Sequence, residues 1–170
     1  MHIYSFPYAA QSDARVLILG TMPSVASLTA TNYYAHPRNA FWPIIYGLWD
    51  ERPPEDWAAR YEFLRSHRIA LWDVACSCTR QASSDASMRD VQPNDIPALL
   101  DECPDIRAVF FNGQKAAALF RSLILPNLPD RSDRCSAIEF VTLPSTSPAR
   151  VQAFETKAAA WRIVRAFLET

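Results

Sequence analysis

The 170-residue chain has the length of one domain and is long enough to bury a hydrophobic core. Hydrophobic residues make up 49% of it and charged residues 21%, which is typical of a compact soluble protein. The net charge of −1, from 17 basic and 18 acidic residues, excludes a protein that coats nucleic acid through overall positive charge. A local basic patch remains compatible with this net charge.

The chain shows no sign of a membrane span or a signal peptide. No apolar run is long enough to cross a bilayer, and residues 1–10 lack the succession of basic, apolar and small residues of a leader. Four cysteines occur, namely Cys76, Cys78, Cys103 and Cys135. They are too few and too unevenly spaced for a disulfide framework, and Cys76 and Cys78 have no second close pair to complete a metal site. We expect free thiols, no bound metal, no membrane contact and a location in the bacterial cytoplasm or nucleoid.

Short apolar runs alternate with helical patterns along the chain. The expected strands are residues 16–20 (VLILG), 69–74 (IALWDV), 107–112 (RAVFFN) and 138–143 (IEFVTL). The expected helices are residues 40–49, 57–66, 95–103 and 113–123, followed by one long amphipathic helix over 151–168. This alternation predicts an α/β fold, a three-layer α/β/α sandwich around a central, mostly parallel four-stranded sheet.

Ligands of such sheets bind outside the carboxyl ends of the strands. The segments that follow the four strands are residues 21–39, 73–88, 112–115 and 144–150. They are dense in Ser, Thr, Pro, Asn, Arg, His and Tyr. The sequence therefore predicts a site where four polar loops converge on one edge of the sheet.

The first of these loops joins polar and aromatic side chains just before a helix. Asn39 is suited to cap that helix, and an amide there also lies where the helix dipole favours negative charge. Tyr33 and Tyr34 belong either to the core or to a pocket that stacks a planar base. Spacing alone leaves both alternatives open.

Two motifs in these loops resemble those of the uracil-DNA glycosylase superfamily. Residues 20–42 (GTMPSVASL, then NYYAHPRNAFW) are similar to the first motif of the hypoxanthine-DNA glycosylases and to the GxNPG and FAHPxNRFW stretch of the mismatch-specific uracil/thymine glycosylases. Residues 143–150 (LPSTSPAR) resemble the superfamily's second motif, a loop that enters the minor groove. The stretches LWDV and SSD between them also follow the hypoxanthine branch, so the matches run in order from Leu17 to Arg150.

The resemblance implies one glycosylase-like domain over residues 1–170 with the α/β sandwich already expected. It also implies a monomeric, monofunctional DNA glycosylase without cofactor or metal. Such an enzyme flips a deaminated base, hypoxanthine or uracil, out of DNA and hydrolyses its N-glycosidic bond, leaving an abasic site for base excision repair. The protein must hold a water below the sugar and offer donors to the departing base.

The resemblance also distributes the catalytic roles. Mismatch glycosylases hold the water with an Asn where this chain has Met22, which has no group for that task and is left as a contact of the base. The hypoxanthine branch moves the essential amide to Asn39, which would position the water or donate to the leaving base. His36 either donates to the base anion or braces its loop.

Two polar residues at strand ends are candidates for reading the base. Related glycosylases use an Asn at the position of Asp73. A carboxylate there would accept the N1–H of hypoxanthine while a backbone N–H meets O6, or it would only cap the next loop. Asn112 suits the turn before Gly113, with base contact as the lesser alternative. Asp85 is a weaker candidate and serves equally well as a loop brace.

Contacts with DNA are expected from all four loops. Arg150 is a candidate for the wedge that fills the gap left by the flipped base, or for a phosphate contact. An Arg here resembles the uracil/thymine mismatch enzymes, whereas the hypoxanthine branch more often has Asn, so the opposite-base preference stays open. The other expected DNA contacts are Ser24, Ser145, Thr146 and Ser147, with a basic rim from Arg38, Arg80 and Lys115.

Two other functions compete with this reading. A catalytically silent nucleic-acid-binding domain would have kept the scaffold, but the intact Asn39 and the 144–150 loop disfavour it. A hydrolase of free nucleosides would need no loop that enters DNA. A Rossmann-type enzyme is excluded because no GxGxxG follows the first strand. A lyase is disfavoured because the only lysines, Lys115 and Lys157, lie outside both motifs.

Overall fold

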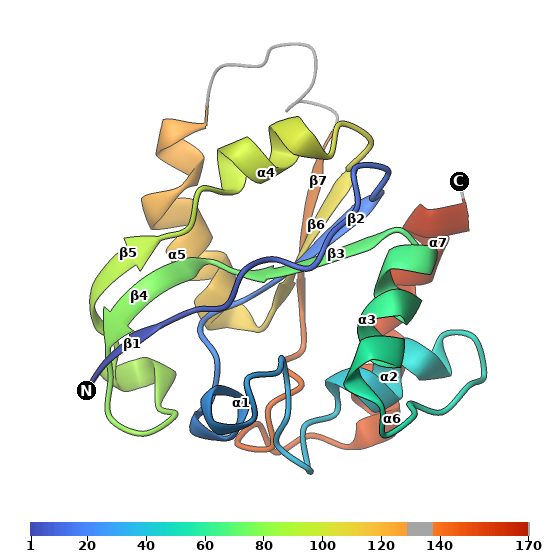
Figure 1. Ribbon diagram of the computed structural model, residues 1–170, viewed down its shortest axis with the longest axis horizontal. Helices are drawn as coiled ribbons and strands as arrows, with labels where there is room; N and C mark the ends of the chain where they lie inside the picture. Colours follow the sequence, from blue (N-terminus) through green and yellow to red (C-terminus); the bar gives the residue numbers. More distant parts are fainter. Residues whose placement is uncertain (129–137, 170) are drawn as a thin grey trace.

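A four-stranded parallel sheet between two groups of helices forms the centre of the computed structural model, which describes residues 1–128 and 138–169 (Figure 1). The strands are β2 (Val16–Gly20), β3 (Ile69–Asp73), β6 (Ala108–Asn112) and β7 (Glu139–Leu143), in the order β3-β2-β6-β7. All four predicted strands are confirmed, with each end placed within one residue. The predicted α/β fold with a central parallel sheet is confirmed as well.

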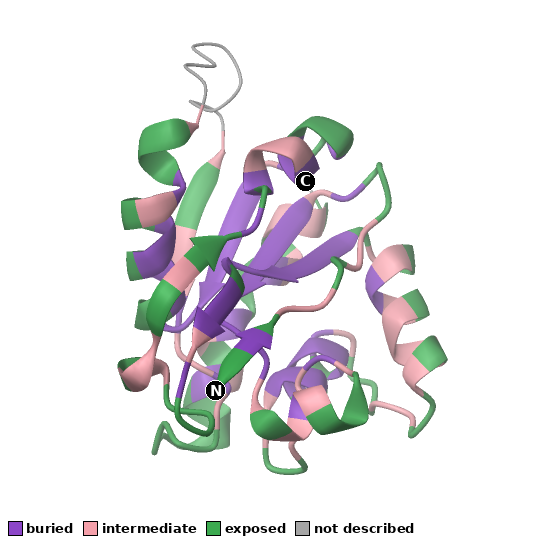
Figure 2. Ribbon diagram, turned by 60° about the vertical axis from the view of Figure 1, so that its left-hand side comes forward, coloured by how far each residue is buried: buried purple, intermediate pink, exposed green. Residues whose placement is uncertain are grey.

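Helices cover both faces of this sheet. Neighbouring residues of a strand point to opposite faces. On β6 the ring of Phe110 lies 5.6 Å from that of Phe167, whereas the ring of Phe111 lies 5.0 Å from that of Phe120. Figure 1 accordingly shows α2 (Phe41–Gly47), α3 (Trp57–Ser66), α6 (Phe154–Trp161) and α7 (Ile163–Glu169) on one side, and α4 (Ile96–Glu102) and α5 (Gln114–Leu123) on the other. The three strands β2, β3 and β6 are buried throughout (Figure 2), as continuous apolar runs predict.

The single long helix expected over residues 151–168 is wrong. Residues 151–153 are not helical, and a turn at Arg162 separates α6 from α7. The two helices serve different surfaces, since α6 packs on α2 and β7 whereas α7 packs on β2. One straight helix would not reach both.

A second, antiparallel sheet was not predicted. It consists of β1 (His2–Tyr4), β4 (Ala75–Thr79) and β5 (Arg89–Pro93), in the order β1-β4-β5. Part of the segment expected as a polar loop, residues 73–88, is therefore strand. The β4 sequence ACSCT lacks an apolar run, and its buried Ala75 and Cys78 form a small cluster with Ile3 and Met22. The short helix α1 (Val25–Ala30) and the 3-10 helices η1 (Asp85–Ser87) and η2 (Leu125–Asn127) complete the described elements.

A bend at Val74 places Asp73 at the edge of the central sheet. The backbone N–H of Val74 donates to Gly20 (2.8 Å), and the side-chain amide of Asn94 donates to the carbonyls of Asp73 (2.9 Å) and Ala75 (3.1 Å). The chain can therefore leave β3 for β4 while the Asp73 side chain stays at the carboxyl end of the strand.

The described cysteines are free thiols, as expected. Cys76 is exposed, and Cys78 and Cys103 are buried, while Cys135 lies outside the described residues. Within residues 1–128 and 138–169, no helix is both long and apolar enough to cross a membrane.

Candidate active site

A cavity of about 100 Å³ opens at the carboxyl ends of the central strands. Its lining includes Met22, Ser24, Tyr33, Tyr34 and Asn39 from the first predicted loop, Asp73 and Asp85 from the second, Asn112 from the third, and Ser145, Thr146 and Ser147 from the fourth. The predicted convergence of four loops is thus confirmed. Pockets for drug-sized ligands usually enclose 300–1,000 Å³, so this one suits a single small group.

A tight turn presents Asn39 to the cavity. The N–H of Asn39 donates to the carbonyl of His36 (2.9 Å), with Pro37 at the second position of the turn, where its fixed φ fits. The Asn39 Oδ1 accepts from the N–H of Phe41 at the start of α2 (3.0 Å). Because that partner is a donor, the amide orientation is fixed, and Nδ2 is left without a hydrogen bond to any described residue. The N-cap residue of α2 is Ala40 and not Asn39 as expected, but the Asn39 Oδ1 satisfies the first N–H of the helix. Its Nδ2 is left as a free donor on a residue that lines the cavity.

His36 lies outside the cavity lining. Its Nδ1 accepts from the backbone N–H of Arg38 (3.1 Å), so the neutral ring carries its hydrogen on Nε2. This contact supports loop bracing over donation to the base.

The two neighbouring tyrosines have different surroundings. The Tyr33 hydroxyl donates to the carbonyl of Pro7 (3.1 Å), and the Tyr33 carbonyl accepts from the indole of Trp42 (2.9 Å), which are contacts of a core residue. Tyr34 has a φ of 54°, and its ring stacks on Phe41 with 4.1 Å between centroids. The Tyr34 hydroxyl is buried and has no hydrogen-bond partner among the described residues.

Asp73 is a buried carboxyl group in the cavity wall. It is 3% exposed, and its Oδ2 accepts from the Ser5 hydroxyl (3.0 Å). Burial raises the pKa of Asp73 to about 7, against the opposing effects of Ser5 and Arg80. A Cβ on Gly20 would lie 2.6 Å from Asp73 Oδ1, so only glycine allows this close approach. A buried, perturbed carboxyl group in a cavity is typical of a functional site.

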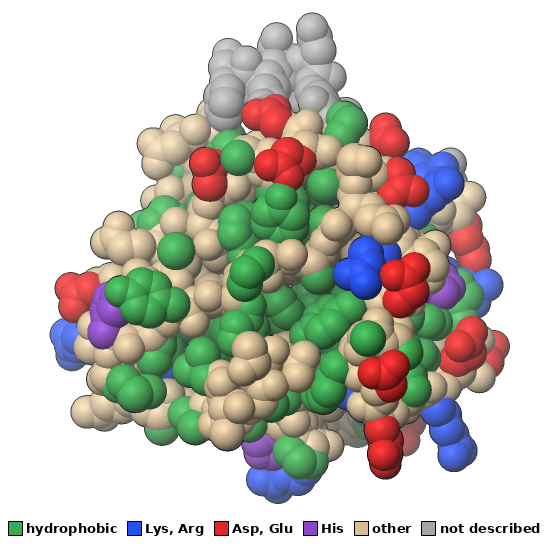
Figure 3. Space-filling model, viewed as in Figure 1, with side chains coloured by type: hydrophobic (Ala, Val, Ile, Leu, Met, Phe, Trp, Pro, Cys, Tyr) green, Lys and Arg blue, Asp and Glu red, His purple; other side chains and the backbone are tan. Residues whose placement is uncertain are grey.

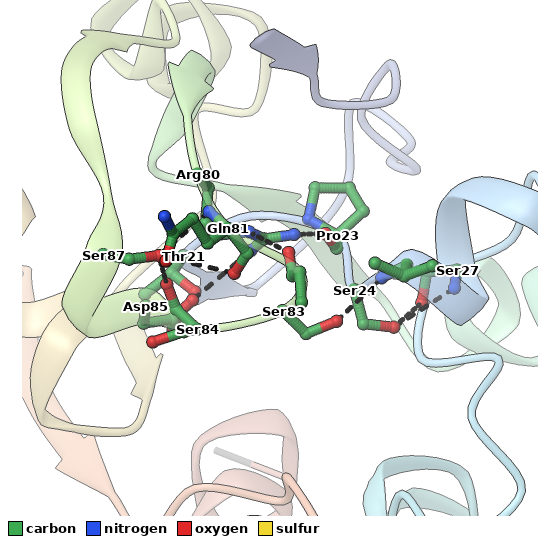
Figure 4. A network of polar contacts seen from close by, with 12 residues as sticks. Thr21, Pro23, Ser24, Ser27, Arg80, Gln81, Ser83, Ser84, Asp85 and Ser87 are labelled. Carbon is green, nitrogen blue, oxygen red and sulfur yellow. Dashed lines mark hydrogen bonds and ion pairs between the residues drawn. The ribbon is translucent and has the colours of Figure 1, made fainter. Parts of the chain in front are cut away.

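The buried Arg80 and the partly exposed Asp85 form a polar network in the wall of the cavity (Figure 4). Arg80 is 2% exposed and donates to the carbonyls of Pro23 and Ala82, and its guanidinium lies 3.4 Å from Asp85 Oδ1. The Thr21 hydroxyl donates to Asp85 Oδ2 (2.7 Å). The expectation that Arg80 contributes to a basic rim is therefore wrong, because its charge is buried. Asp85 acts as the brace that was expected as one alternative.

Met22 and Ser24 line the cavity without offering free polar groups. Met22 packs in the small cluster of the second sheet. The Ser24 Oγ caps α1 by accepting from the N–H of Ser27 (3.1 Å).

Asn112 fixes the fourth loop to the end of β6. Its Nδ2 donates to the Thr146 hydroxyl (2.9 Å), and its Oδ1 accepts from the Thr146 N–H (2.9 Å). The Thr146 carbonyl accepts from Ala40 next to Asn39 (3.0 Å), so both motif loops are joined there. The phosphate contact expected of Thr146 is not available to its side chain, which is buried and paired. Ser145 and Ser147 accept backbone N–H groups, and their hydroxyl hydrogens stay free for phosphates.

Two side chains of α6 hold the same loop by hydrogen bonds to its carbonyl groups. Lys157 is buried, and its ammonium group donates to the carbonyls of Ser147 (3.2 Å) and Arg150 (3.0 Å). The indole of Trp161 donates to the Pro144 carbonyl (2.9 Å). Sequence reasoning gave this helix no function, because nothing in its pattern distinguishes a lysine that points inward from one in solvent.

A shallow groove beside the loop combines basic and apolar side chains. It is lined in part by Arg38, Arg150, Val151 and Phe154, and Val151 is 97% exposed. Lys115 is also exposed, near the start of α5. The face in Figure 3 carries interleaved acidic and basic side chains without a broad basic patch, in agreement with the net charge of −1. The groove has the composition of a surface that meets phosphates and inserts an apolar side chain between bases.

Replacement of Arg150 by alanine is expected to slow duplex processing about tenfold and single-strand processing much less, because only a duplex leaves a gap to fill. Single-turnover rates on matched duplex and single-strand substrates would test this. An equal loss on both, with the salt dependence of log K reduced by about one, would assign Arg150 to a phosphate instead.

Replacement of Lys157 by methionine should loosen the fourth loop, since two carbonyl groups lose a charged donor. We expect roughly tenfold weaker binding of lesion-containing duplex, measured by fluorescence anisotropy. Arg52→Met removes an exposed positive charge outside the four site loops and serves as the control. Equal affinities of the two variants would show that Lys157 does not position the loop.

The chain is similar to known DNA glycosylases in sequence and in fold. The family model of the uracil DNA glycosylase superfamily matches residues 6–169. A protein of Methanosarcina acetivorans named hypoxanthine DNA glycosylase is 29% identical over 160 residues, which cover 94% of this chain and 95% of the relative. A protein of the same name from Methanosarcina barkeri is 32% identical over 112 residues, which cover 65% of this chain and 71% of the relative. The solution NMR structure of a Methanosarcina acetivorans protein, described as a candidate uracil DNA glycosylase, has a TM-score of 0.83 and 29% identity over the whole of both chains.

Proposed function

Because this chain belongs to the uracil DNA glycosylase superfamily, we propose that it is a monofunctional glycosylase that excises a deaminated base, hypoxanthine or uracil, from DNA. The observation that carries the proposal is the meeting of the free Asn39 amide and the buried Asp73 carboxyl group in one small cavity. The relatives named hypoxanthine DNA glycosylase support hypoxanthine as the first substrate to test. The product would be an abasic site for base excision repair.

The geometry gives each group a task in hydrolysis of the N-glycosidic bond. The pinned fourth loop would hold the flanking phosphates through Ser145 and Ser147, while the flipped base enters the cavity. Asp73 would accept the N1–H of the base. The Asn39 Nδ2 would hold the water that attacks the sugar or donate to the departing base, which gathers negative charge as the bond breaks.

A base-release assay tests this function. Purified protein is incubated in a chelator with end-labelled duplexes that contain hypoxanthine, uracil, xanthine or mismatched thymine, and the products are treated with alkali. Alkali-dependent cleavage at a lesion is the expected result and identifies the substrate. No cleavage at any lesion, with the DNA still bound in a mobility-shift assay, would favour a silent nucleic-acid-binding domain instead.

A further inference from the structure

Two oxygens without partners face the same point on the floor of the cavity. A Cβ on Gly20 would lie 2.8 Å from the Tyr34 Oη and 2.6 Å from the Asp73 Oδ1. Among the described residues no hydrogen bond reaches the Tyr34 hydroxyl, and Asp73 is bonded to Ser5 through Oδ2 alone. The absence of a side chain at Gly20 therefore leaves room beside two groups without partners, the Tyr34 hydroxyl as a donor and the Asp73 Oδ1 as an acceptor.

The Tyr34 hydroxyl is held rigidly in this place. Its ring stacks on the buried ring of Phe41 with 4.1 Å between centroids and 23° between planes. The side chain of Asn112 lies beside the hydroxyl, but its Oδ1 accepts from the Thr146 N–H and its Nδ2 can only donate, so Asn112 offers no free acceptor for the Tyr34 hydrogen. Burial raises the pKa of Tyr34, so the hydroxyl keeps its hydrogen and remains a donor. A buried hydroxyl without a partner is unfavourable, which indicates that a ligand supplies the acceptor.

We propose that Tyr34 and Asp73 together read the lactam edge of the flipped base. In hypoxanthine the Tyr34 hydroxyl donates to O6 while the Asp73 carboxylate accepts from N1–H. Tyr34 thus takes the place that a backbone N–H was expected to fill. Uracil carries the same edge as O4 and N3–H. This inference rests on the proposed function and names the chemical feature that its substrates share.

The same pair of groups would reject undamaged adenine and cytosine. Adenine presents an acceptor, N1, to the Asp73 carboxylate, so that contact is repulsive. Its amino group also offers no acceptor for the Tyr34 hydrogen, which therefore stays without a partner. Sites built to hydrogen-bond one edge discriminate against the wrong one by roughly 10⁴–10⁵-fold. Deamination exchanges one edge for the other, which is the change a repair enzyme has to detect.

Tyr34→Phe tests the proposal, because it removes the hydroxyl and keeps the ring on Phe41. Tyr33→Phe is the matched control, since the Tyr33 hydroxyl donates to the carbonyls of Phe6 and Pro7 and not to a ligand. Single-turnover release is measured for hypoxanthine and for its 6-thio analogue, whose thione form keeps N1–H but replaces O6 by sulfur, a weak acceptor. Thermal unfolding of all three proteins is recorded as well.

We expect Tyr34→Phe to release hypoxanthine about 100-fold more slowly than the wild type, with an unfolding temperature that is equal or higher. The preference for hypoxanthine over the 6-thio analogue should vanish in Tyr34→Phe and persist in Tyr33→Phe. A wild-type rate in Tyr34→Phe, or equal slowing on both bases, would overturn the inference while leaving the glycosylase function intact. Absence of base release by the wild type would instead overturn the function itself.

Discussion

Asn39→Ala is expected to release base at least 100-fold more slowly than the wild type while binding lesion-containing DNA with nearly the same affinity. The substitution removes the Nδ2 donor that faces the cavity, and a single preorganised donor of this kind contributes about 10²–10³-fold to a rate. It also removes the Oδ1 that accepts from the Phe41 N–H at the start of α2, which should lower the free energy of unfolding by about 1 kcal/mol. Single-turnover kinetics and urea denaturation measure the two effects separately. Wild-type rates in this variant would remove Asn39 from the catalytic machinery.

Asn39→Asp separates the two roles open to the amide. A carboxylate still accepts from the Phe41 N–H, so this hydrogen bond and the stability should be retained. If Asn39 donates to the departing base, the aspartate variant is as slow as the alanine variant, because a carboxylate offers no hydrogen. If Asn39 holds the attacking water, the aspartate variant retains much of the rate.

Asp73→Asn is expected to raise the free energy of unfolding, and to raise it more at high pH than at low pH. The folded-state pKa of about 7 lies above the ordinary value of 3.8, so ionisation of Asp73 opposes folding. The neutral carboxyl group costs no stability below pH 3.8. Stability then falls progressively as the pH rises from 3.8 and reaches its full loss above about 7. At 1.36 kcal/mol per pKa unit, the variant should gain about 4 kcal/mol at pH 8.5 and only about 2 kcal/mol at pH 5.

Urea denaturation at the two pH values measures this gain. Asp90→Asn makes the same substitution at an exposed carboxylate and should change stability little at either pH. A gain that is absent, or that is equal at pH 5 and pH 8.5, would contradict the burial of Asp73 as an ionisable group.

The same ionisation should appear in catalysis. Only the carboxylate accepts N1–H, so kcat/KM for hypoxanthine is expected to rise with pH and to level off above about 7. The profile of Asp73→Asn should lack this rise. An unchanged profile in the variant would assign the pH dependence to another group.

Asp73 and Tyr34 are both held in the cavity in ways that lower the stability of the unliganded protein. Asp73 is buried with a raised pKa, and Tyr34 combines a left-handed backbone conformation with a hydroxyl that has no partner. These features are unfavourable in the unliganded protein, and under the proposal above a bound base would supply the partners that the hydroxyl and the carboxyl group lack.

The central sheet was predictable because its strands are short, mostly apolar runs separated by helical patterns. The second sheet was not predictable, because β4 is made of small residues. Their burial depends on β1, near the N-terminus, and on Met22. Periodicity also could not show the turn at Arg162, because apolar spacing continues across it. What decides the break is the pair of different surfaces under α6 and α7.

At the site, the loops were predictable and the individual contacts were not. Asp73 and Asn112 end their strands and Asn39 lies in the loop after β2, and this was enough to predict that all three lie at one edge of the sheet. Burial of Arg80 and of Lys157 could not be inferred, because their partners include backbone carbonyls, which carry no signal in the residue types of the sequence. The need for glycine at position 20 likewise appears only when Asp73 and Tyr34 are placed against it.

The measurement that tests the central claim most directly is the identification of the released product. Wild-type protein is incubated with a hypoxanthine-containing duplex in a chelator, and the small-molecule fraction is quantified by mass spectrometry beside the count of alkali-labile sites. We predict free hypoxanthine in amounts equal to the abasic sites formed, and neither product from Asn39→Ala on the same time scale. Strand cleavage without free base, or an intact duplex that the protein nevertheless binds, would contradict a glycosylase site in this cavity.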